Sequence, residues 1–248
     1  MASPVLSRNK NFSARGPFGG MSGVSATPIT VSDVLNRSAV SFGVLVLGAV
    51  VGWQFTAVLL PALIVGFILA MVNSFKREPV PALILAYAAA EGLTLGALSG
   101  FFDSIPKYAG IVPEAVIGTF AVVGVVLALF RFAGVRATAR GNRIFFAAIL
   151  GYIVYSLVNL VLMATGINSD PWGLGGSITL FGVPLGIILS AFAVLLGSYS
   201  LVMDFTFVEN AVKNQVDKKY AWTATFGIMV TVVWLYVEIL RLLAQSRR

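Results

Sequence analysis

Two acidic residues, Asp204 and Glu238, lie within long apolar stretches near the end of this 248-residue chain. Both belong to residues 201–241, whose pattern predicts two apolar helices joined by a charged turn at about 217–220. An unpaired carboxylate within such a helix costs several kcal/mol at membrane depth. The default hypothesis for an acid found there is therefore a role in an ion or proton pathway. Asp204 and Glu238 are therefore the first candidates for chemistry.

The spacing of these two residues predicts that their side chains can meet. Asp204 lies 13 residues before Asp217, and Glu238 lies 18 residues after Tyr220. At about 1.5 Å of rise per residue, their depths in an antiparallel helix pair differ by about two turns. Two close carboxylates cannot both ionise cheaply, so we expect them to share one proton. Such a pair would act as a proton switch, a cation site, or both.

Two further charged residues are candidates for an accessory role. Glu91 lies inside another apolar stretch, where it is either part of the site or a hydrogen-bonded packing residue near Thr94. Arg241 follows Glu238 at the i,i+3 spacing of a local helical ion pair. Arg241 could also compete with a cation for the two carboxylates.

The composition excludes several kinds of chemistry. The chain has no Cys and no His, which removes disulfides, thiolate catalysis and soft-metal sites. No serine within an apolar stretch has a histidine base, so we predict no catalytic residue and no enzyme activity. A response to pH must then come from carboxylates. Ca²⁺ prefers oxygen ligands, so Asp204 and Glu238 could bind it as a permeant ion, with no other cofactor.

The overall composition indicates a membrane protein. The chain is 58% hydrophobic and only 11% charged, against about 25% charged residues in a soluble domain. Its mean hydropathy is +0.92. The basic residues that give the chain its net charge of +7 lie in loops between apolar stretches. We interpret this charge as a topology signal and predict a lipid bilayer, not nucleic acid, as the partner.

The apolar stretches predict an all-α membrane protein with seven transmembrane helices. Residues 38–75 carry no charge and would span about 57 Å as one helix, so they must fold back into two. The predicted helices cover about 38–55, 57–75, 80–101, 115–132, 144–165, 177–204 and 220–243. Residues 1–34 are predicted to be a disordered cytoplasmic tail, and residues 35–248 the seven-helix domain.

The basic residues predict the orientation of these helices. Thirteen of the 17 Lys and Arg residues fall on the side of the N-terminus. The positive-inside rule then places the N-terminus in the cytoplasm. Arg241, Arg247 and Arg248 fall on the opposite side, which leaves open a last helix that only dips into the membrane.

Glycine spacing predicts two structural features. Gly92, Gly96 and Gly100 repeat every four residues, which allows another helix to approach closely. Residues 182–186, with the sequence GVPLG, predict a kink or a break in the sixth helix.

Three short motifs, in this order, resemble the Bax inhibitor-1 (transmembrane Bax inhibitor motif) family, and its bacterial branch in particular. They are the stretch EGLTLG at residues 91–96, the segment ending at Asp204, and WLYVEIL at residues 234–240. The resemblance covers about residues 35–245.

The resemblance implies six helices packed around a central C-terminal helix. It also implies a pH-sensitive Ca²⁺ leak channel in a cell membrane, here a bacterial inner membrane, controlled by acids on the last two helices. Those acids correspond to Asp204 and Glu238, with Glu in place of the family's usual second Asp. Near the position of the family's basic latch residue this chain has Ser74, with Lys76 and Arg77 just beyond.

Two other functions stay open at this stage. The chain could be a non-transporting modulator that binds a membrane protease or another membrane protein, using the basic Gly/Ser-rich residues 1–30 as the contact. It could also be a proton-coupled transporter, although the sequence lacks substrate-binding polarity and an internal repeat.

Overall fold

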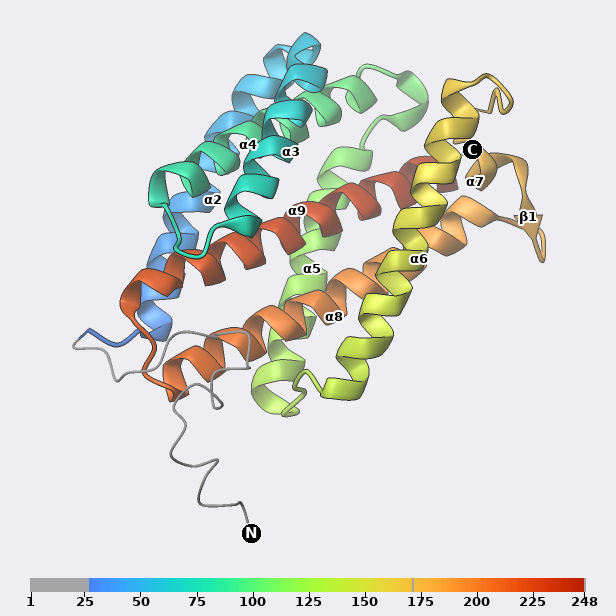
Figure 1. Ribbon diagram of the computed structural model, residues 1–248. Helices are drawn as coiled ribbons and strands as arrows, with labels where there is room; N and C mark the ends of the chain where they lie inside the picture. Colours follow the sequence, from blue (N-terminus) through green and yellow to red (C-terminus); the bar gives the residue numbers. More distant parts are fainter. Residues whose placement is uncertain (1–26, 171, 248) are drawn as a thin grey trace.

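Seven long helices make up most of the chain in a computed structural model, which describes residues 27–170 and 172–247 (Figure 1). The long helices are α2 (Val31–Gln54), α3 (Leu59–Phe75), α4 (Pro81–Asp103), α5 (Ile111–Phe132), α6 (Ala139–Ala164), α8 (Leu185–Lys213) and α9 (Ala221–Ser246). The shorter elements are the 3-10 turns η1 (Thr56–Val58), η2 (Pro106–Tyr108) and η3 (Lys218–Tyr220), the one-turn helix α7 (Leu174–Ser177), and the strands β1 (Thr179–Leu180) and β2 (Val183–Pro184).

All seven long helices are long and apolar enough to cross a membrane. Large apolar side chains cover their outer surfaces, as in α6, where Phe145 is the one buried residue. Since lipid takes the place of water around such surfaces, these side chains need no protein partner. The prediction of an all-α, multi-pass membrane protein with seven helices is confirmed.

Helix α9 runs through the middle of the bundle (Figure 1). It packs against α2, α4, α5 and α8, while α3 packs mainly against α4 on the outside. Polar side chains at two levels of α9 each reach a neighbouring helix. Tyr236 meets Ser99 of α4 at 2.6 Å, and Thr225 meets Ser38 of α2 at 3.3 Å. These contacts fix α9 as the central helix of the bundle.

Helices α2 and α4 approach so closely that their backbones touch. A Cβ atom on Gly92 would collide with the carbonyl oxygen of Leu45, and one on Gly96 would collide with Ala49. Gly100 lies in the same row, beside the backbone of Trp53. The three glycines therefore lie at a helix–helix contact, as their spacing predicts.

The N-terminal boundary of the helical domain lies earlier than predicted. Helix α2 begins at Val31, where Thr30 and Asp33 form a capping box. The Ile29 amide donates to the Val216 carbonyl at 2.8 Å, and the Ile29 side chain is 2% exposed. Residues 27–34 are thus ordered by capping and by the turn before α9. The rest of the predicted disordered tail, residues 1–26, lies outside the described residues.

The sixth long helix begins later than predicted, at Leu185 instead of near residue 177. Strands β1 and β2 form a hairpin just before it, with Phe181 and Gly182 at the turn. These two residues have φ values of 52° and 80°, which suit a tight two-residue hairpin turn. The GVPLG stretch therefore ends a hairpin and starts α8: it breaks the predicted sixth helix, and the alternative of a kink is wrong.

Candidate functional site

Helices α8 and α9 form an antiparallel pair whose register decides where the two acids lie. Asp204 is level with Thr231, because the Thr231 hydroxyl donates to Asp204 Oδ2 at 2.7 Å. Further along, Gly197 faces Leu235. The same register places Glu238 level with residues of α8 that precede Gly197.

This register separates the two carboxylates. Glu238 lies seven residues beyond Thr231 on α9, which corresponds to about 10.5 Å of helix rise. The two side chains share no hydrogen-bond partner: Asp204 accepts from Thr231, whereas Glu238 accepts from Tyr152 and Trp234. The prediction of a directly proton-sharing pair is corrected: the two-turn offset inferred from the sequence is too large for two short side chains to bridge.

Asp204 belongs to a short chain of hydroxyl groups between α8 and α9. The Thr231 hydroxyl has one hydrogen and donates it to Asp204. Ser200, 3.2 Å from Thr231, must then donate in turn. Gly227 allows the close approach, because a Cβ atom there would lie 3.0 Å from Asp204 Oδ1. Asp204 is partly buried, about nine residues inside the end of α8.

Glu238 is buried among side chains of α6 and α9. It is 3% exposed. The Tyr152 hydroxyl donates to Glu238 Oε1 at 2.5 Å, and the Trp234 indole N–H donates to the same oxygen at 3.2 Å. Arg241 donates to the Tyr152 oxygen at 2.9 Å. Tyr152 thus links the guanidinium to the carboxylate and ties α6 to α9.

The second oxygen of Glu238 has no hydrogen-bond partner in the described part of the chain, although it is buried. The Arg241 guanidinium lies 3.7 Å away, as the i,i+3 spacing predicts, but beyond hydrogen-bond reach. Burying a carboxylate oxygen without a partner is costly. Oε2 is therefore the position where a proton, a closer guanidinium or a cation would gain the most.

A cavity of about 220 Å³ adjoins this cluster on the side of the C-terminus. Tyr152 and Arg241 form part of its wall. The other lining residues come from α6, the α7 region, the start of α8 and the end of α9: Tyr155, Ser156, Asn159, Met163, Trp172, Gly175, Gly186, Leu189, Ser190 and Gln245. The cavity is large enough for several water molecules, and its wall includes polar side chains together with Arg241.

Leu235 occupies the space between the levels of the two carboxylates. It is fully buried and packs over Gly197, where a Cβ atom would collide with the leucine side chain. The Asp204 cluster and the Glu238 cluster are thus separated by an apolar contact.

The remaining predicted accessory residues lie elsewhere. Glu91 of α4 faces Gly66 of α3. Lys76 and Arg77 are exposed in the turn between α3 and α4, and neither makes an ion pair with any residue in the ranges described. Ser74, near the family's latch position, donates to the Ala70 carbonyl of its own helix. None of the four joins Asp204 or Glu238.

The described residues contain no group of three or more acids that could hold a metal ion. Asp204 and Glu238 each supply one carboxylate, and nearby hydroxyls and waters would have to complete the coordination of Ca²⁺.

Sequence reasoning did not identify three functional partners. Trp234 precedes Glu238 by four residues, so helical spacing could have indicated it. Thr231 and Tyr152 carry no such signal: their contacts depend on the register of α8 with α9 and on the packing of α6, which no local pattern specifies.

Comparison with known families agrees with this architecture. A family model described as Bax inhibitor 1 like matches residues 3–248, which is nearly the whole chain. A comparison with curated proteins yields no match. The match covers all seven membrane-spanning helices together with the clusters around Asp204 and Glu238, so this chain belongs to the Bax inhibitor 1-like family.

Proposed function

We propose that this chain forms a pH-sensitive leak pathway for Ca²⁺, in which Glu238 and Asp204 are two successive ion-contact positions along the contact between α8 and α9. Ca²⁺ is the cargo of this pathway, and the protein acts as a conduit, not as an enzyme. The observation that carries the proposal is the buried Glu238 oxygen without a hydrogen bond, close to Arg241 and next to a polar cavity.

The position of the two carboxylates supports a pathway along the α8–α9 contact. Glu238 lies eight residues from the end of α9, and Asp204 lies nine residues from the end of α8. The ends of α8 and α9 lie at opposite ends of this antiparallel pair, so each carboxylate lies about 12–14 Å from a different end of it. A cation entering from the cavity would meet Glu238 first, then the hydroxyls of Thr231 and Ser200, and then Asp204. Leu235 would have to move aside, so the proposed pathway would be closed in this conformation.

The charges around Glu238 suggest how the pathway would be held closed. The Glu238 carboxylate attracts Arg241 and accepts the Tyr152 hydrogen bond, which holds α6 against α9. A neutral side chain at position 238 would remove the attraction for Arg241. We therefore expect such a variant to loosen this closure and to increase the leak.

Ca²⁺ flux through proteoliposomes tests the proposal. Wild-type flux is measured at pH 8 and at pH 6, and a pH-sensitive leak requires the two values to differ. Glu238→Gln removes the negative charge beside Arg241, so its flux at pH 8 should exceed the wild-type value by about fivefold or more, as expected for a coupling of about 1 kcal/mol or more. Glu91→Gln is the matched control, because it changes a carboxylate of another helix that faces Gly66.

Two results would contradict this assignment. Equal changes in Glu238→Gln and Glu91→Gln would show that Glu238 has no special role in closure. Flux no greater than that of protein-free liposomes at either pH would overturn the leak itself and favour the non-transporting modulator.

A further inference from the structure

A second cavity lies at the opposite end of the bundle from the Glu238 cluster. It occupies about 520 Å³ between the start of α2 and the ends of α5 and α8. We name it the rim groove. Its walls are mainly apolar and include Leu127, Phe205 and Val208. The rim carries four charged side chains, Arg131, Arg136, Glu209 and Lys213.

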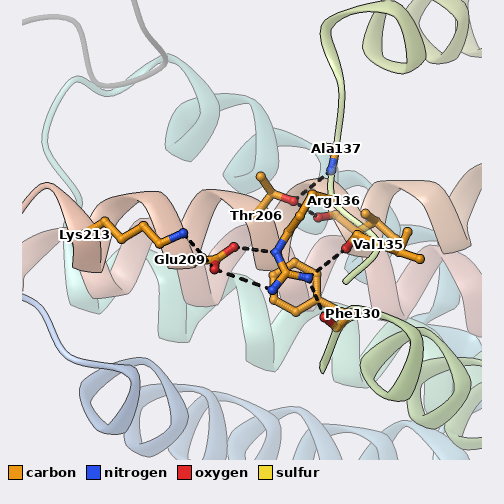
Figure 2. Close-up of polar contacts among 8 residues, drawn as sticks. Phe130, Val135, Arg136, Ala137, Thr206, Glu209 and Lys213 are labelled. Atoms are coloured by element: carbon orange, nitrogen blue, oxygen red, sulfur yellow. Dashed lines mark hydrogen bonds and ion pairs between the residues drawn. The ribbon is translucent and has the colours of Figure 1, made fainter. Parts of the chain in front are cut away.

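One acid holds two of the three cations at fixed positions on this rim (Figure 2). Arg136 Nε lies 2.6 Å from Glu209 Oε2, and Lys213 Nζ lies 2.9 Å from Glu209 Oε1. The Arg136 guanidinium also lies over the Phe130 ring and donates to the carbonyl oxygens of Phe130 and Val135. This cluster ties the α5–α6 connection to α8 and keeps positive charge at the mouth of the groove.

The third cation, Arg131, makes no hydrogen bond or ion pair within the ranges that the structure describes. Its side chain is exposed at the rim. With Glu209 counted, the four rim side chains carry a net charge of about +2, since three are basic and one is acidic. The groove therefore combines an apolar wall with an excess of positive charge at its mouth.

We propose that the rim groove binds an anionic phospholipid, with its acyl chain along the apolar wall and its headgroup phosphate at Arg131 beside Arg136 and Lys213. Basic pockets between helices at a membrane surface bind anionic headgroups in this way. Arginine matches phosphate oxygens geometrically and stays charged at all relevant pH values. A free phosphate ion would use the cations but leave the apolar wall empty.

The N-terminal residues of the chain are a less suitable occupant. Residues 1–26 contain Arg8, Lys10 and Arg15 and no acidic residue. Their positive charge would be repelled by the basic rim, whereas a phosphate group would be attracted both by the rim and by these residues. Charge complementarity thus favours lipid over this segment.

Lipid binding to the purified full-length protein tests the proposal, with native mass spectrometry as the readout. We titrate phosphatidylglycerol and phosphatidylcholine of the same acyl chains, and expect tighter binding of phosphatidylglycerol. Arg131→Gln should weaken phosphatidylglycerol binding about fivefold, the effect of one basic residue near a membrane surface. Arg143→Gln is the matched control, because Arg143 is an exposed arginine of α6 that does not line the groove.

A second variant tests the apolar wall separately. Leu127 is half-exposed along the groove, so Leu127→Trp should fill part of it and weaken phosphatidylglycerol binding while the protein still folds. Equal binding of the two lipids, or equal losses in the two arginine variants, would overturn the proposal. Competition by inorganic phosphate at concentrations comparable with the lipid would assign the rim to free phosphate instead.

Discussion

At the scale of single residues, the two acids occupy different environments. Asp204 accepts from Thr231 in a partly exposed position, while Glu238 is buried and shares Tyr152 with Arg241. The pair of acids that the resemblance implies thus forms, in this conformation, two separate clusters at different levels of the contact between α8 and α9.

Separate clusters predict independent energetic effects. In a double-mutant cycle of Asp204→Asn and Glu238→Gln, the changes in unfolding free energy should add to within about 0.5 kcal/mol, because side chains about 10 Å apart without shared partners rarely couple. Reversible unfolding in mixed micelles measures these changes. A coupling well above 1 kcal/mol would indicate that the carboxylates meet in solution.

At the scale of the helices, one apolar side chain lies between the levels of the two acids in the contact between α8 and α9. Leu235 packs over Gly197 between the two acidic levels. The contact between α2 and α4 depends instead on glycines that bring two backbones together. The first contact is therefore filled by a side chain, whereas the second is made by backbone atoms.

Shortening Leu235 should open the proposed pathway. Leu235→Ala is expected to raise Ca²⁺ flux at pH 8, because it removes the apolar group between the two acids. Leu240→Ala serves as the control: it truncates a leucine of the same helix that is 1% exposed, and both changes should cost about 2–5 kcal/mol of stability. Flux assays and thermal melting distinguish the two effects, and equal flux in both variants would point to general loosening.

Adding one methyl group at the rigid contact should be costly. Gly96→Ala would press a Cβ atom into the Ala49 backbone, so we expect a loss of about 2 kcal/mol or more. Gly124→Ala in α5 meets no atom within 4 Å, and it should leave stability unchanged or raise it by about 0.5 kcal/mol. Thermal unfolding in detergent measures both, and similar melting temperatures would contradict the close contact.

At the scale of the whole molecule, charged side chains mark its two ends. Near the start of α9, Lys218 pairs with Asp33 and Lys219 pairs with Glu78. At the other end Arg247 pairs with Glu114. Arg247 is one of the basic residues that count against the predicted orientation, and this ion pair offsets its charge. Helix α9 has 26 residues, about 39 Å, so it is long enough to cross a hydrocarbon core of about 30 Å.

The orientation itself can be measured directly, because the chain has no cysteine. Arg77 and Lys107 lie on the two sides of α4, in exposed connections. With the N-terminus in the cytoplasm, Lys107→Cys should react with a membrane-impermeant maleimide in intact cells, and Arg77→Cys only after permeabilisation. The reverse pattern would invert the topology, and reaction of both in intact cells would mean that α4 does not cross the membrane.

The sequence by itself determined the class of the protein and the residues worth testing. Seven apolar stretches, separated by charged or proline-containing turns, predict seven helices because a membrane requires long, unbroken apolar helices with internally satisfied backbones. The four-residue glycine repeat and the i,i+3 spacing of Glu238 and Arg241 are local patterns, and both predicted contacts are present.

Only the tertiary structure decided which of those residues meet. The register of α8 against α9 places Thr231, not Glu238, beside Asp204, and the packing of α6 brings Tyr152 to Glu238 across 86 residues of sequence. Neither fact follows from local composition. Register depends on the turn and on every side chain along the helix contact together, and a shift of two turns leaves each helix equally apolar.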